Sequence, residues 1–310
     1  MSYIETMIEC GRKDYGRNFW SYMRGDMSAY TRLMENSAPD TGAFHMPTGS
    51  DSKYDKAILR ESIARQLSSV FSSYDSAAKI WAADSDDLAE FIPEFGDIAI
   101  RDAVNDFQKL PVERYKLATL LRLPSEFVAD AAFDFESYLI RRLAKCFGRA
   151  EDKAFITGTG TGEPTGLLHD TDGAETGTSA ALSYDSVIDL YFSVKPEYRR
   201  GGAWLMNDGT AHALKKLKDD SGNYLWRGSD DTIMGKPVVI SEYMPSAESG
   251  AKPILFGDFS YYWLIKRSPV TVKVIKELFA LNGQTGYLAF EFLDGKLIRR
   301  DAVKALQIGA

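Results

Sequence analysis

The chain has 310 residues, of which 45% are hydrophobic, so it can bury a sizeable core as one large domain or two moderate ones. Its formal charge of −7 argues against the global positive field that nucleic-acid-binding proteins use. Two cysteines are too few for a disulfide framework, and no apolar run approaches the roughly 18 residues that span a bilayer. These features predict a soluble protein of a reducing compartment, with no membrane partner.

Two helical stretches and an irregular segment are predicted before residue 72. Residues 1–35 place apolar side chains such as Tyr15 and Phe19 at helical spacing. We expect this apolar face to contact another subunit or the interior of an assembly, with packing against its own body as the alternative. Pro, Gly, Ser and Asp in residues 36–53 predict a linker or extended arm, and residues 54–71 predict a helix.

Residues 77–108 fit neither a helix nor an ordinary connection. The segment mixes aromatic, apolar and acidic residues, and structureless loops beyond about 15 residues are uncommon in compact domains. A hairpin with arms of about 15 residues would reach roughly 50 Å. Because such a hairpin is not stable in water on its own, we predict that it lies on another surface. The acidic residues gathered in residues 83–91 are typical of a solvated loop.

The middle of the chain has the clearest periodicity. Residues 115–123 alternate apolar and polar side chains, which predicts a strand. Residues 133–156 carry an apolar stripe at three- and four-residue steps, which predicts a helix about 36 Å long. Cations face away from that stripe: Arg141, Arg142, Lys145 and Arg149.

Shorter helices and strands are predicted towards the C-terminus. Residues 183–194 and 209–218 predict capped helices. Three strands should end the chain, with Asp294 and Gly295 forming a tight turn. Further strands are expected at residues 203–207, 236–245 and 254–267. The mixture of a long helix, short helices and strands predicts the α+β class.

A glycine-rich stretch, AFITGTGTGEPTGLL, follows the long predicted helix. Its turn residues are Gly158, Gly160, Gly162, Pro164 and Gly166. A phosphate-binding loop requires Gly-Lys-Ser/Thr and precedes a helix, whereas Glu163 follows Gly162 here and the helix comes first. Phosphates bind at helix N-termini, and a helix C-terminus exposes carbonyl groups instead. We therefore predict a structural turn with a left-handed glycine cap.

Catalytic and metal-binding patterns are not found in the sequence. His45, His169 and His212 lack the paired spacing of a metal site. The stretch HDTDGAE lacks the spacing of a calcium-binding EF-hand, and no G-x-S-x-G elbow occurs. The sequence predicts no enzyme activity, no catalytic residue, no metal and no cofactor.

The order of segments nevertheless resembles a known family. FESYLIRRLAKCFGRAEDKAFITGTGTGEPTGLL is similar to the spine helix and glycine turn of tailed-phage major capsid proteins with the Hong Kong 97-type fold. AWLMNDGTAHALKKLKDDSGNYLW resembles the family's Trp-x-Met-Asn stretch and following helix, and GKPVVISEYMP and ILFGDFSYYWLIKR resemble its next strands. The match runs in consistent order from about Ile92 to the C-terminus.

The resemblance implies a Hong Kong 97-like architecture with four parts. These are an N-terminal helix and arm (1–76), an extended loop (77–112), a peripheral domain (113–170 and 268–292) and an axial domain (171–267 and 293–310). Loop residues implied to contact other subunits are Trp81, Phe91, Ile92, Phe95 and Ile98. The implied tip of the peripheral domain is Leu281, Asn282, Gly283 and Gln284.

The implied function is a major capsid protein that self-assembles through pentamers and hexamers into an icosahedral head. Its partners would be further copies of itself, a portal protein and a scaffolding or decoration protein. Double-stranded DNA would be non-specific content, to which an acidic shell has no strong attraction. The protein would assemble in the host cytoplasm and reside in the virion.

Two features depart from many relatives, and two other functions are left open. We expect no large cleaved N-terminal domain, and no lysine between Ile80 and Gln108 is available to cross-link with Asn282. An encapsulin-type compartment, which shares the fold and encloses cargo enzymes, is the first alternative. An α+β nucleotide-binding enzyme is the distant alternative.

Overall fold

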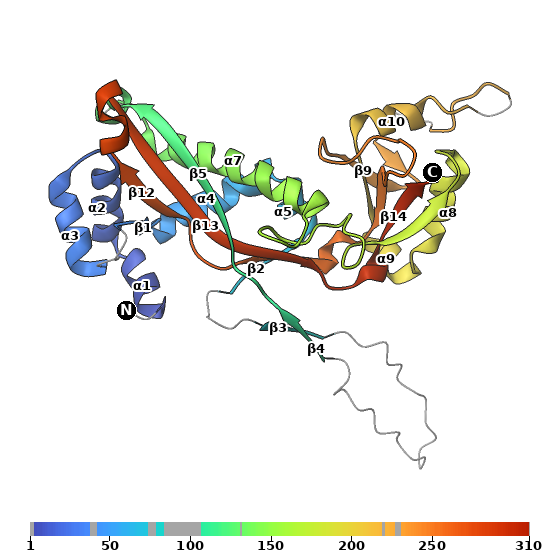
Figure 1. Cartoon of the computed structure of the whole chain (residues 1–310), viewed down its shortest axis with the longest axis horizontal. Coiled ribbons are helices and arrows are strands. Elements are labelled where there is room, and N and C mark those ends of the chain that lie inside the picture. Colours follow the sequence, from blue (N-terminus) through green and yellow to red (C-terminus); the bar gives the residue numbers. More distant parts are fainter. Residues whose placement is uncertain are drawn as a thin grey trace, which may run out of the picture.

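The computed structural model describes residues 3–37, 42–73, 79–83, 107–130, 132–218, 221–226 and 231–309. The chain is elongated, with N-terminal helices at one end and a second sheet with its helices at the other (Figure 1). None of the helices in these ranges is long and apolar enough to cross a membrane.

A six-stranded sheet forms the long wall of the molecule, and β13 (Gln284–Leu297) runs through its whole length. On one side β13 pairs antiparallel with β5 (Tyr115–Pro124). On the other side it pairs first with β12 (Thr271–Ile275) and then with β11 (Tyr262–Lys266). Two short strands extend this sheet, β1 (Phe44–His45) beside β12 and β2 (Ser69–Ser72) beside β11.

The predicted turn at Asp294 and Gly295 is wrong, because β13 continues through both residues. The Asp294 carboxylate accepts hydrogen bonds from the backbone N–H groups of Glu113 and Gly295, each at 2.8 Å. A side chain at position 295 would collide with the Tyr262 ring. The Asp-Gly pair therefore serves close packing inside a strand rather than a change of direction.

A helix layer covers one face of this sheet. It consists of α7 (Phe135–Thr157), which confirms the predicted long helix, with α4 (Thr48–Glu61) and α5 (Ile63–Leu67) beside it. Alternate residues of β5, such as Leu121 and Leu123, pack into the core with α7. Their neighbours Lys116 and Arg122 are exposed on the opposite face of the sheet. The molecule is thus a two-layered wall here, with helices on one side.

The expectation that the N-terminal apolar face contacts another subunit is wrong for the second helix. Tyr15, Phe19 and Met23 of α2 (Lys13–Met23) are buried in the same core as α7 and β13. Tyr287 of β13 donates a hydrogen bond to the Met23 carbonyl at 2.8 Å. The other N-terminal helices are α1 (Tyr3–Cys10) and α3 (Met27–Ser37).

The predicted helix at residues 54–71 is also corrected. Helix α4 begins six residues earlier, at Thr48, and ends at Glu61. Ser62 then caps α5, its hydroxyl accepting a hydrogen bond from the Arg65 backbone N–H at 3.2 Å. The last part of the expected helix is strand β2, because it is held by pairing with β11.

A second six-stranded sheet forms the other end of the molecule. Its order is β6 (Glu175–Ser179), β14 (Val303–Ile308), β10 (Ile254–Gly257), β7 (Ala203–Met206), β9 (Lys236–Ile240) and β8 (Thr232–Ile233). Trp204 and Phe256 lie in its core with ring centroids 4.2 Å apart. The expected cap Ser183 begins α8 (Tyr184–Ser193). Helix α10 (Asp208–Lys215) is capped by Asn207, which was expected to end a strand, and it stops three residues before the predicted end at residue 218.

Short elements complete the chain. They are α6 (Ser125–Ala129), α9 (Pro196–Gly201), η2 (Phe259–Tyr261), η3 (Glu277–Asn282) and η4 (Arg300–Ala302). Two segments differ from the implied domains. Strand β11 and residues 293–297 of β13 were expected in the axial part, yet their hydrogen bonds place both in the first sheet. Strand β11 follows β10 closely in the sequence, but its hydrogen bonds to β13 decide which sheet it joins.

The glycine turn fastens the end of α7 to the first sheet. Gly158 caps the helix with φ −59°, so the predicted left-handed cap is wrong there; positive φ values occur later, at Gly160 (73°) and Gly162 (75°). The Gly166 N–H donates to the Gly158 carbonyl at 2.9 Å, and both glycines approach backbone too closely to carry a side chain. After Pro164, Thr165 binds the sheet through the Gly295 carbonyl (3.2 Å).

A buried cluster of charges joins the helix layer to the sheet. Arg65 donates two hydrogen bonds of 2.7 Å to the Glu151 carboxylate. Lys266 of β11 lies 3.0 Å from the nearest oxygen of Asp51, in α4. Glu291 of β13 is fully buried and accepts one hydrogen bond, at 2.8 Å from Tyr54. We call Arg65, Glu151, Lys266, Asp51, Tyr54 and Glu291 the buried charge cluster.

Burial, and next the nearby Glu151 carboxylate, raises the pKa of Glu291 from its ordinary 4.5 to about 7. The folded chain therefore holds a proton that the unfolded chain releases as the pH rises through 4.5. Retaining this proton adds to the unfolding free energy. The added free energy is largest below pH 4.5 and is lost as the pH rises to about 7. The variant Glu291→Gln should remove this contribution, which we would measure by urea unfolding of unassembled chain between about pH 5 and 8.

The matched comparison is the difference in unfolding free energy between wild type and Glu291→Gln, since other carboxyl groups titrate equally in both. We expect wild type to lose more stability than the variant as the pH rises. Parallel pH profiles for the two proteins would contradict the assigned titration.

The glycine turn provides a second prediction. A Cβ at position 166 would lie 2.7 Å from the Ile156 carbonyl oxygen, so Gly166→Ala should lower the unfolding free energy by about 1–3 kcal/mol. Gly49→Ala in α4 is the matched control, because no heavy atom lies within 4 Å of its added Cβ. Urea unfolding measures both variants, and equal stabilities would refute the proposed crowding.

Candidate assembly surfaces

A hairpin leaves the body where the extended loop was expected. Strands β3 (Lys79–Ala83) and β4 (Phe107–Pro111) pair antiparallel, with Ile80 opposite Leu110. Figure 1 shows the pair projecting away from the wall. Trp81 lies in β3, opposite Lys109. The other loop residues singled out lie outside the described ranges: Phe91, Ile92, Phe95 and Ile98.

The base of the hairpin is tied to β13. Lys296 donates a hydrogen bond to the Pro111 carbonyl at 2.7 Å, and Glu113 donates its N–H to Asp294. Between them Val112 is buried. The two strands therefore emerge from a fixed point on the wall.

The expected tip lies at the far end of the first sheet. There η3 ends in Gly283, whose φ of 61° turns the chain into β13 at Gln284. Leu281 is fully exposed and Leu278 is 68% exposed. These two exposed leucines give the extremity a small apolar surface, next to Asn282, Gly283 and Gln284 in the chain.

The face of the first sheet opposite the helix layer carries cations above aromatic rings. Arg114 lies 4.2 Å from the Phe292 ring centroid, and Lys116 lies 4.5 Å from that of Phe290. Further along β5, Leu120 is 43% exposed. We call this the open sheet face. Sequence reasoning missed it, because the alternation of β5 was visible but its register on β13 was not.

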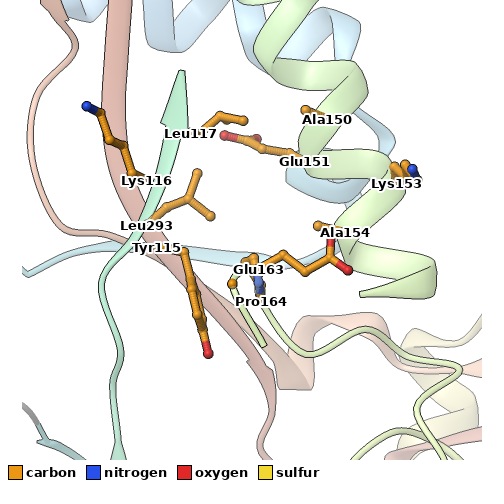
Figure 2. A pocket seen from close by; sticks show the side chains of 11 residues that line it. Tyr115, Lys116, Leu117, Ala150, Glu151, Lys153, Ala154, Glu163, Pro164 and Leu293 are labelled. Atoms are coloured by element: carbon orange, nitrogen blue, oxygen red, sulfur yellow. The ribbon is translucent and has the colours of Figure 1, made fainter. Parts of the chain in front are cut away.

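A cavity of about 210 Å³ lies between β5, β13, α7 and the glycine turn (Figure 2). Its lining includes Glu151 from α7, Glu163 from the turn, and Tyr115 and Leu117 from β5. No serine, cysteine or histidine is among the lining residues, so the lining does not contain a Ser–His or Cys–His pair. Both Glu151 oxygens already bind Arg65.

Metal binding has equally little support in the described ranges, where no cluster of three His, Cys, Asp or Glu could hold an ion. The three histidines are separate: His45 contacts Thr271 in the first sheet, His169 contacts Thr171 in a turn, and His212 lies in α10. The features that stand out in the described ranges are the projecting β3–β4 pair, the exposed tip and the open sheet face.

Comparisons with known proteins agree with this geometry. The model of the Phage capsid family matches residues 42–308. The major capsid protein of Escherichia phage T5 is 28% identical over 158 residues, which cover 44% of this chain and 34% of that protein. A capsid polyprotein of Pseudomonas phage PAJU2 is 25% identical over 159 residues, covering 47% of this chain and 23% of that protein. The matches thus span a quarter to a third of these relatives' length.

Among solved structures, the capsid of a native GTA particle computed with C5 symmetry superposes with a TM-score of 0.65. It is 28% identical, and the match covers 82% of this chain and 90% of the GTA chain. The expected α+β class and capsid architecture are confirmed by this similarity. The chain therefore belongs to the phage capsid family and has the Hong Kong 97-type fold of tailed-phage major capsid proteins.

Proposed function

We propose that copies of this chain assemble through pentamers and hexamers into an icosahedral head shell that encloses a phage genome. The observation that carries the proposal is the family match across residues 42–308. Repeated contacts between different surfaces of identical chains close into rings, and rings join into a shell. Many modest contacts per subunit make such a shell cooperative.

The first contact we propose places the extended loop of one copy on the open sheet face of another. Residues 84–106 contain eight acidic residues and one arginine, a net charge of −7, which equals the net charge of the whole chain. The open sheet face offers complementary cations: Arg114, Lys116 and Arg122. Charge complementarity of this kind fixes which surfaces meet and in which register.

Apolar residues would stabilise the same contact. Trp81, Phe91, Ile92, Phe95 and Ile98 are the loop side chains we assign to it. On the receiving copy, exposed Leu120 and the partly exposed rings of Phe290 and Phe292 supply apolar area. The tip, Leu281 to Gln284, would form a second contact with a neighbouring ring.

The proposed shell also gives each part of the chain a place. Residues 113–170 and 268–292 would form the peripheral domain, and 171–267 with 293–310 the axial domain near the ring centre, apart from β11 and residues 293–297 of β13, which belong to the first sheet. A portal protein and a scaffolding or decoration protein would be further partners, and the chain would act without catalysis. Assembly would take place in the host cytoplasm.

Negative-stain electron microscopy with light scattering tests the proposal on the chain expressed alone and with a scaffold protein. Closed shells, or rings of five and six, are the expected particles. A stable monomer of about 35 kDa in both preparations would contradict shell formation.

The loop contact generates a prediction of its own. Replacing Lys116 and Arg122 by Glu should strongly reduce shell yield, because two attractive contacts with the acidic loop become repulsive. The matched control reverses the exposed cations Lys13 and Lys216, far from the open sheet face. Both variants should keep the wild-type melting temperature within a few degrees. Equal shell yields for the two variants would refute the contact.

A further inference from the structure

The outer side of the helix layer carries a row of cations. Helix α7 exposes Arg141, Arg142, Lys145, Arg149 and Lys153, while the residues between them are largely buried. We call these five residues the basic stripe. Three steps of four residues separate Arg141, Lys145, Arg149 and Lys153, so they follow one side of the helix over about 18 Å.

Neighbouring acids do not neutralise the basic stripe. Of the acidic residues in α7, Glu151 and Asp152 are buried and turned towards Arg65 and Ser62. Glu136, near the start of the helix, pairs with Lys53 of α4 at 2.7 Å. Within the described ranges, no carboxylate lies within 4.0 Å of a stripe cation. Five positive charges therefore face outward in a chain of net charge −7.

The packing of α4 against α7 widens this positive surface. The two helices lie side by side, joined near their starts by Lys53 and Glu136 and near the end of α4 by Ser62 and Asp152 (2.8 Å). On α4, Lys56 and Arg60 are also exposed, accompanied by one exposed acid, Glu61. The helix layer thus presents an excess of positive charge.

The basic stripe and the open sheet face lie on opposite sides of the two-layered wall. In β5, odd-numbered residues such as Leu117 pack towards α7, and even-numbered residues such as Lys116 point the other way. The acidic loop is assigned to the open sheet face, on the other side of the wall from the basic stripe. In a shell, one side of such a wall faces the enclosed genome.

We propose that the basic stripe binds the phosphate backbone of duplex DNA, so that the helix layer lines the inside of the shell. This inference rests on the proposed shell function. Over about 18 Å, duplex DNA presents about ten phosphate charges, enough to match every stripe cation. Contacts to phosphates alone carry no sequence information. Binding is therefore weak, independent of sequence and steeply dependent on salt, with non-specific dissociation constants of about 10⁻⁴–10⁻⁶ M.

The proposal replaces the expectation that an acidic shell has no strong attraction for DNA. That expectation used net charge, which sums over the whole chain. The structure places the stripe cations together on one side of the wall, and the sequence concentrates acidic residues in residues 84–106. A local positive surface then governs DNA contact, whatever the total charge.

The test measures the binding of fluorescent 20-base-pair duplex DNA to unassembled full-length chain by anisotropy, at a series of salt concentrations. The test variant carries Arg142→Gln, Lys145→Gln and Arg149→Gln, since glutamine keeps helix propensity. The slope of log K against log salt should become less negative by about 2.7, or 0.9 for each phosphate contact removed. The control removes three exposed cations elsewhere, with Lys13→Gln, Arg17→Gln and Lys216→Gln, and should keep the wild-type slope.

Equal slopes for the two variants, or no DNA binding by wild type at low salt, would overturn the proposal. Shell formation by both variants is followed in parallel by electron microscopy. Loss of shells in the stripe variant with its DNA binding unchanged would also overturn the proposal, because the stripe would then be a contact between copies. Absence of shells for wild type would instead count against the proposed function, independently of the DNA result.

A second measurement needs no variant. Acetylation of lysines in the wild-type chain, read by mass spectrometry, should be slowed at Lys145 and Lys153 by added duplex DNA. Lys13 and Lys216 should react at unchanged rates. Equal protection at all four lysines, or none, would contradict a DNA site on the basic stripe.

Discussion

A buried set of charges fixes the helix layer on the first sheet, and the placement of every outer surface depends on it. Arg65 binds Glu151 of α7, and Lys266 of β11 binds Asp51 of α4, so the cluster joins helices to the sheet. Removing one partner of a buried pair leaves an uncompensated charge, which costs about 3–5 kcal/mol. Directional ion pairs also define one relative position of the layers, which apolar packing alone defines less sharply. The open sheet face and the basic stripe are therefore held on opposite sides of a rigid wall.

Local patterns predicted much of this structure. The alternation of β5, the apolar stripe of α7 and the cap at Ser183 depend on neighbouring residues, and all three are present. The errors lie where distant contacts decide. The Asp294–Gly295 pair has the composition of a turn, but Tyr262 and Glu113 hold it within β13. The apolar face of α2 lacked a visible partner in the sequence, because its partners are α7 and β13, more than a hundred residues away.

Of the candidate surfaces, the extended loop was predicted from the sequence, but the basic stripe and the open sheet face were not, because both depend on contacts between distant residues. A hairpin at residues 77–108 follows from length and composition, and β3 pairs with β4 at its base. The cations of α7 were visible in the sequence, but it was not visible that Glu151 and Asp152 of the same helix are buried and bonded to Arg65, Ser62 and Ala64. The open sheet face required the register of β5 on β13, which places Lys116 and Arg114 over rings of the neighbouring strand. Net charge conceals the two cationic surfaces, because the charges outside residues 84–106 sum to zero.

Electron cryo-microscopy of shells assembled from the full chain tests the central claim most directly, because it locates both faces of the wall. The account predicts that the helix layer lines the inner surface of the shell, with Arg141 to Lys153 facing the lumen. It also predicts that residues 84–106 of each copy lie across the β5 and β13 strands of a neighbour. Shells with the basic stripe on the outer surface, or with the open sheet face free of any neighbouring chain, would contradict it.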